Sequence, residues 1–148
     1  MSNETTPRTR TVRAALETDT QFGAVVPPIY LSSTYARDGD YKPLLKENYV
    51  RNGNPTLWQT EEAIAALERG TSALLFASGM AAITILLETV PQGAHVVAPD
   101  VMYYGTREWL QRLEGLGRIS LTLFDPREPS VLVKALQPGK TDLVWIET

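Results

Sequence analysis

The chain has 148 residues, of which 43% are apolar and 21% charged, and its formal net charge is −3. This profile is typical of a globular domain and excludes a strongly basic binder of nucleic acid or of an anionic membrane. With no cysteine and a single histidine, His95, the sequence offers no disulfide, no thiolate nucleophile and no histidine-based metal centre. No segment resembles a membrane span or a secretory leader, so we expect a cytoplasmic protein.

The first part of the chain is predicted to be largely extended or irregular. Residues 1–8 predict a disordered tail and residues 9–17 a short helix. Pro27 and Pro28 fix φ and lack an N–H donor, so residues 23–35 are expected to be extended without forming a central strand. Residues 36–55 are polar and rich in Gly, Asn, Asp and Pro, which predicts a long loop.

A helix is expected to begin at Thr56. Thr56 can cap this helix, and Gln59 stands at the reciprocal position of a capping box. Gly70 is expected to end it, because glycine readily adopts the left-handed conformation that follows many helices.

From residue 72 onward, strand and helix patterns alternate. Three helices are predicted in this part of the chain. The first runs from the Ser78-Gly79 turn to about Val90, the second follows a loop over residues 99–105, and the third covers residues 129–136. The predicted strands cover residues 72–76, 94–98, 119–124 and 142–147. Four alternations predict an α/β fold with a mainly parallel sheet and flanking helices.

The turn at Ser78-Gly79 is the candidate binding element. A strand that enters a helix through small residues leaves free N–H groups at the helix start, and these groups bind anions such as phosphate. Gly79 has no side chain to keep a ligand away from the backbone. Taken alone, the same pattern also fits a tight turn without a ligand.

Five stretches of the chain together carry a family resemblance. They are residues 26–35, 49–56, 78–83, 100–106 and 144–148. In order and spacing, they resemble the PLP-dependent enzymes of Cys/Met metabolism, the cystathionine γ-synthase/γ-lyase group, over the N-terminal portion of the family only. The resemblance implies part of the type I PLP-dependent transferase fold. Residues 1–55 would form an N-terminal arm and inter-subunit loop, and residues 56–148 the first part of the PLP-binding α/β domain.

The resemblance also implies roles for individual residues. Gly79 and Met80 would donate backbone N–H groups to the phosphate of pyridoxal 5′-phosphate (PLP). Tyr49 and Arg51 would reach the cofactor phosphate of a neighbouring subunit in a homo-oligomer, a dimer or tetramer. Tyr103 would stack on the cofactor ring.

Two further positions bear on this assignment. Tyr104 stands where the family commonly has glycine, which leaves Tyr103 and Tyr104 as alternatives for the stacking residue. Glu147 is expected to form hydrogen bonds near the cofactor.

The family's catalytic lysine has no counterpart in this chain. In the family, the lysine that anchors the cofactor, the aspartate at the pyridine nitrogen and the arginine for the substrate carboxylate all follow the matched region. The four lysines of this chain lie outside the matching motifs and are expected to be solvated: Lys42, Lys46, Lys134 and Lys140.

The sequence leaves two alternative hypotheses for the function. The chain is the N-terminal part of a PLP-dependent transsulfuration enzyme that acts on small amino acids by β- or γ-elimination or replacement, and is inactive alone. Alternatively, it is a non-catalytic α/β domain that binds a phosphate-bearing ligand or a partner.

Overall fold

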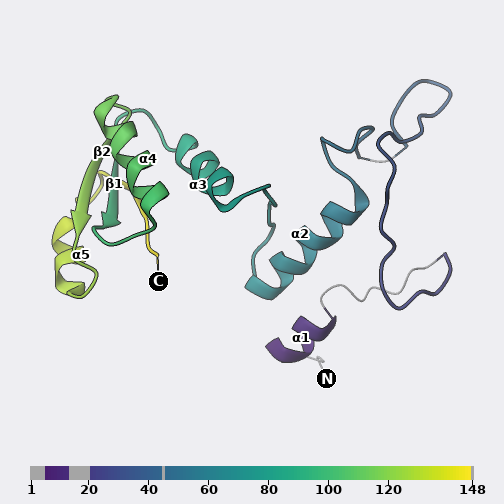
Figure 1. The fold of residues 1–148 in the computed structure, drawn as a ribbon, viewed down its shortest axis with the longest axis horizontal. Coiled ribbons are helices and arrows are strands. Elements are labelled where there is room, and N and C mark those ends of the chain that lie inside the picture. The colour runs from purple at the N-terminus through teal and green to yellow at the C-terminus, as the bar shows by residue number, and fades with distance from the viewer. Residues whose placement is uncertain (1–5, 14–20, 45, 148) are drawn as a thin grey trace. The chain divides into compact units, whose positions relative to one another are not determined.

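The computed structural model describes residues 6–13, 21–44 and 46–147. The chain forms two compact units, Met1–Leu75 and Phe76–Thr148 (Figure 1). Among the described residues, no helix is long and apolar enough to cross a membrane.

The N-terminal unit contains two helices, α1 (Pro7–Arg13) and α2 (Pro55–Glu68), which contact each other. Helix α1 begins two residues earlier than predicted, so Pro7 and Arg8 are helical and not part of a disordered tail. The predicted continuation of this helix over residues 14–17, and the tail over residues 1–5, lie outside the described residues.

The prediction that Thr56 caps α2 is wrong. Asn54 is the N-cap residue, and its side-chain oxygen accepts a hydrogen bond from Leu57 N–H at 3.0 Å. Pro55 then takes the first helical position, where its missing N–H costs nothing. The Thr56 hydroxyl accepts instead from Tyr30 N–H at 2.9 Å, which fastens the extended segment to the helix. At the other end, Arg69 adopts the left-handed conformation with φ 57°, directly before the predicted stop at Gly70.

The loop between these helices is folded back on itself. Thr34 and Tyr49 form an antiparallel bridge. It is flanked by hydrogen bonds from Tyr35 N–H to Asn48 O at 3.1 Å and from Val50 N–H to Ser33 O at 2.9 Å. This pairing fixes the backbone that carries Tyr49.

The C-terminal unit is the predicted α/β fold with a parallel sheet. Its helices are α3 (Gly79–Glu88), α4 (Tyr104–Gly115) and α5 (Pro129–Ala135), and its strands are β1 (Ala94–Pro99), β2 (Ile119–Phe124) and β3 (Thr141–Val144). The strand order is β2-β1-β3, and β1 pairs in parallel with both neighbours.

The central strand β1 organises the core of this unit. All six of its residues are buried, as expected for a strand paired on both edges and covered by helices. Its alternate residues join one hydrophobic cluster with side chains from α3, the segment after α3, α4 and β2: Leu87, Val90, Ala94, Val96, Ala98, Leu110, Leu113 and Ile119.

Three predictions for the chain from residue 72 onward need correction. Residues 72–76 do not form a strand, because no described segment pairs with them and both edges of β1 are occupied by β2 and β3. The sheet therefore has three strands, not four, among the described residues. Helix α4 begins at Tyr104, so Gly105 is helical and not in the preceding loop, and β3 ends at Val144, before Trp145.

Candidate functional site

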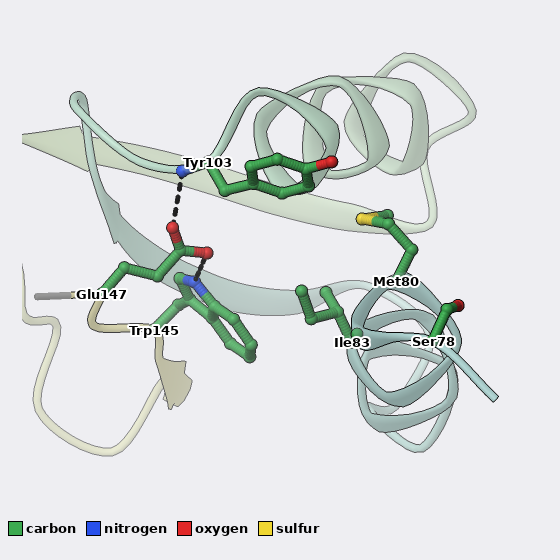
Figure 2. A pocket seen from close by; sticks show the side chains of 7 residues that line it. Ser78, Met80, Ile83, Tyr103, Trp145 and Glu147 are labelled. Carbon is green, nitrogen blue, oxygen red and sulfur yellow. Dashed lines mark hydrogen bonds between the residues drawn. The ribbon is translucent and has the colours of Figure 1, made fainter. Parts of the chain in front are cut away.

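An open pocket of about 510 Å³ lies in the C-terminal unit. Three short segments supply its lining: the start of α3, the residue before α4 and the residues after β3. The lining residues are Ser78, Gly79, Met80, Ile83, Tyr103, Trp145 and Glu147 (Figure 2). Tyr103 and Glu147 follow the carboxyl ends of β1 and β3, which is where parallel α/β sheets bind ligands.

The start of α3 presents two free N–H donors to this pocket. Ser78 is the N-cap residue, and its hydroxyl oxygen accepts from Ala81 N–H at 3.1 Å. The backbone N–H groups of Gly79 and Met80 have no acceptor among the described residues. Because the positive end of the helix dipole lies at the same place, this arrangement suits an anion.

Glycine at position 79 is not required by the protein itself. Its φ lies outside the left-handed region, and a Cβ added there would meet no heavy atom within 4 Å. Neither the backbone conformation nor the packing therefore excludes a side chain at Gly79. A ligand that approaches the backbone closely would exclude one.

Of the two tyrosines considered for ring stacking, only Tyr103 lines the pocket. Tyr104 is 69% exposed, and a hydrogen bond between its hydroxyl and Glu108 raises the pKa of Tyr104. Gly105 allows Tyr103 and Met80 to come close. A Cβ on Gly105 would lie 2.8 Å from Met80 Sδ and 2.9 Å from a Tyr103 ring carbon.

Glu147 accepts three hydrogen bonds beside the pocket. Its Oε2 accepts from Tyr103 N–H at 2.5 Å, and its Oε1 accepts from the Trp145 ring N–H and the Thr106 hydroxyl, each at 2.9 Å (Figure 2 draws the first two). Burial raises the pKa of Glu147, and the hydrogen bonds from Tyr103, Trp145 and Thr106 lower it. The combined effect of the three hydrogen bonds is larger than that of burial, so the pKa of Glu147 lies below its ordinary value. The carboxylate is therefore ionised at neutral pH.

Tyr49 and Arg51 lie together in the N-terminal unit. The Arg51 Cζ atom is 5.2 Å from the centroid of the Tyr49 ring, and Arg51 Nη2 donates to the Tyr49 hydroxyl at 3.4 Å. Arg51 is exposed, so its remaining guanidinium donors are accessible to an anion.

The structure also shows where the lysines and the possible metal ligands lie. All four lysines are exposed, and none lines the pocket. Among the described residues, no group of three or more His, Asp or Glu side chains could hold a metal ion. Sequence reasoning gave no role to Trp145 or Thr106. Trp145 could have been noticed as an indole donor two residues before Glu147, whereas Thr106 becomes visible only once α4 is placed.

Comparison with known proteins identifies the family of the chain. A family model described as "Cys/Met metabolism PLP-dependent enzyme" matches residues 8–148. The chain is 37% identical over 140 residues to a probable cystathionine gamma-synthase of Herpetosiphon aurantiacus, covering 95% of this chain and 43% of that protein. It is 36% identical over 140 residues to a cystathionine gamma-lyase of Dictyostelium discoideum, covering 95% and 36%.

Solved structures show the same relationship. The crystal structure of metB from Corynebacterium glutamicum superposes with a TM-score of 0.87 at 31% identity, covering 99% of this chain and 38% of that chain. A cystathionine gamma synthase from Xanthomonas oryzae pv. oryzae, in complex with aminoacrylate and cysteine, gives 0.77 at 36% identity, covering 88% and 34%. The chain thus spans well under half the length of these relatives. By the family match and these similarities, the chain belongs to the PLP-dependent enzymes of Cys/Met metabolism.

Proposed function

We propose that the pocket of the C-terminal unit binds pyridoxal 5′-phosphate. The free N–H groups of Gly79 and Met80 would hold the phosphate, and Tyr103 would stack on the ring. The observation that carries this proposal is the pair of unpaired donors at the start of α3, at a glycine that the fold itself does not require.

The residues that line the pocket fit this cofactor. Phosphate suits two N–H donors at a helix start, and a flat ring suits the aromatic side chains of Tyr103 and Trp145. When bound, PLP supplies a conjugated ring that stabilises negative charge developing at the α-carbon of an amino acid. What this chain contributes is binding and orientation, with the Glu147 carboxylate holding the Tyr103 backbone.

We further propose that the chain is the N-terminal part of a cystathionine γ-synthase-like enzyme that acts on small sulfur-containing amino acids in the cytoplasm. Relatives of this kind match almost the whole chain. Residues 1–55 would serve as an arm and inter-subunit loop, and residues 56–148 as the first part of the PLP-binding domain. Tyr49 and Arg51 would act on the cofactor phosphate of a neighbouring subunit, because a guanidinium pairs well with phosphate oxygens.

One observation favours a second candidate, a non-catalytic phosphate-ligand domain. Lys134 and Lys140, the two lysines of the C-terminal unit, do not line the pocket, so neither is placed to anchor the cofactor covalently there. Lysine labelling, described in the Discussion, separates a covalent anchor from simple binding.

Binding of pyridoxine 5′-phosphate and of pyridoxine, measured by equilibrium dialysis, tests the proposal. Neither compound has an aldehyde, so condensation with surface lysines does not interfere. We expect the phosphorylated compound to bind on the order of tenfold more tightly or better, because each hydrogen bond to a charged group contributes about 1.5–3 kcal/mol. Gly79→Ala should abolish that preference, since its methyl group occupies the approach to the two N–H donors.

Gly115→Ala is the matched control. A Cβ on Gly115 also meets no heavy atom within 4 Å, and Gly115 lies outside the pocket lining. This variant should bind like the unmodified chain. Equal affinity for the two compounds in the unmodified chain, or an unchanged preference in Gly79→Ala, would contradict the phosphate assignment.

A further inference from the structure

We propose that Glu147 is a positioning residue whose carboxylate fastens the start of α4 to the segment after β3 and so holds Tyr103 in the pocket. This inference rests on the proposed cofactor function of the pocket. It adds a residue that acts on the pocket through Tyr103, from whose backbone N–H it accepts a hydrogen bond.

The start of α4 lacks a cap of its own. Tyr103 occupies the N-cap position, but its side chain makes no capping hydrogen bond, and the first turn contains no acidic residue. Such a helix start leaves N–H groups without acceptors and lacks a negative charge near the positive end of its dipole. Glu147 supplies both, because its Oε2 accepts from Tyr103 N–H and its Oε1 accepts from the Thr106 hydroxyl in the first turn.

The carboxylate is held rigidly in this place. The Trp145 ring N–H donates to the same Oε1 atom at 2.9 Å, while Trp145 N–H donates to Val97 O of β1 at 2.8 Å. Glu147 is therefore connected to the sheet through Trp145 and to α4 through Thr106. Thr106 is fully buried. Three donors to one carboxylate leave it little rotational freedom.

The Tyr103 ring depends on this anchor for its position. The side chain is 60% exposed, so burial alone does not fix it. Its described neighbours include the backbone of Gly105 and the flexible thioether of Met80, which is a weak positional restraint. The Tyr103 backbone, in contrast, is bound to a carboxylate 44 residues further along the chain. Trp145 and Tyr103, the two aromatic lining residues, are thus both hydrogen-bonded to Glu147 (Figure 2).

The test compares Glu147→Gln with the unmodified chain. Glutamine keeps the shape of the side chain but offers one oxygen acceptor to three donors, so at least one hydrogen bond is lost. Glu128→Gln is the matched control, because Glu128 is exposed and its side chain makes no capping hydrogen bond at the start of α5. Thr106→Val removes one donor while keeping the carboxylate and the shape of the buried side chain, so it serves if Glu147→Gln does not fold.

Two measurements keep the positioning role distinct from the cofactor assignment. The first is amide hydrogen exchange at Tyr103 without any ligand. We expect protection to fall on the order of tenfold or more in Glu147→Gln, to fall less in Thr106→Val, and to stay unchanged in Glu128→Gln. The second is the dissociation constant for pyridoxine 5′-phosphate. We expect it to rise severalfold in Glu147→Gln and to stay unchanged in Glu128→Gln.

The outcomes are separable. Unchanged Tyr103 protection in Glu147→Gln, or weakened protection with unchanged affinity, overturns the positioning role. If the unmodified chain binds no pyridoxine 5′-phosphate, the proposed cofactor function fails, and the positioning of Tyr103 is then decided by hydrogen exchange alone. Acidification gives a further check. Lowering the pH below the ordinary carboxylate range should weaken Tyr103 protection in the unmodified chain more than in Glu147→Gln.

Discussion

His95 Nε2 lies 2.9 Å from the hydroxyl oxygen of Thr122, and this contact joins the central strand β1 to β2. On its other side, His95 Nδ1 lies 2.9 Å from the hydroxyl of Thr141 at the start of β3. The ring is almost fully buried, with 5% of the residue exposed. One imidazole therefore connects all three strands of the sheet through side-chain hydrogen bonds.

His95→Ala should destabilise the C-terminal unit by about 2–4 kcal/mol, because it creates a cavity and leaves two threonine hydroxyls without their ring partner. Urea unfolding followed by circular dichroism measures the change. His95→Gln keeps a polar side chain that can bind one of the two hydroxyls, so its loss of stability should be smaller. A loss below about 0.5 kcal/mol in His95→Ala would show that the bridging hydrogen bonds contribute little to stability.

The stability of the C-terminal unit should depend on the ionisation of Glu147. Hydrogen bonds from Tyr103, Trp145 and Thr106 outweigh the effect of burial and lower the pKa of Glu147 below its ordinary value of 4.5. A group with a lowered folded-state pKa stabilises the fold above its unfolded-state pKa and loses that contribution as the pH falls through the folded-state pKa. The free energy of unfolding should therefore fall as the pH is lowered below 4.5.

Urea titrations at several pH values below 7 measure this dependence. Glu147→Gln should flatten the part of the curve below pH 4.5. Glu128→Gln should leave the curve unchanged in shape. Identical pH dependence in the unmodified chain and in Glu147→Gln would assign the acid sensitivity to other carboxylates.

Helix α2 should depend on Asn54 and much less on the hydroxyl of Thr56 for its capping. Asn54→Ala removes the acceptor for Leu57 N–H and should cost about 1 kcal/mol. Asn54→Asp keeps a side-chain oxygen and should retain most of the stability. Thr56→Val removes the acceptor for Tyr30 N–H, so amide exchange should rise at Tyr30 and not at Leu57.

No single lysine should capture PLP. Each of the four lysines is exposed, and none lines the pocket. Reduction of a PLP mixture with borohydride, followed by peptide mapping, should show weak labelling spread over several lysines. Stoichiometric labelling at one lysine would contradict this expectation and would favour a covalent cofactor anchor within the chain.

The sequence predicted best those elements that local chemistry determines. The α/β class, the three strands of the sheet and the helix start at Ser78-Gly79 follow from hydrophobic patterning and from glycine and serine preferences. The lining of the pocket also includes four residues that were given expected roles from the sequence: Gly79, Met80, Tyr103 and Glu147. Their roles toward a cofactor stay predictions.

The sequence failed where the result depends on distant partners. Residues 72–76 have the composition of a buried strand, but a strand also needs a neighbour with which to pair, and composition does not reveal one. Asn54 and Thr56 are both good capping residues, but Asn54 caps the helix, and the Thr56 hydroxyl accepts from Tyr30 N–H, which lies 26 residues away in the sequence. The hydrogen bonds from Tyr103 and Thr106 to Glu147 join residues more than 40 positions apart, so no local pattern predicts them.

The Gly79 and Met80 donors at the start of α3 belong to the main chain, while the Ser78 hydroxyl oxygen accepts from Ala81 N–H within the helix. Any anion bound there would be recognised without help from the side chain of residue 80. Replacing Met80 by another helix-forming residue would preserve both donors, whereas a branched side chain at position 79 would block access to them. Among proteins that share this site, we therefore expect substitutions to be tolerated at position 80 and to be removed by selection at position 79.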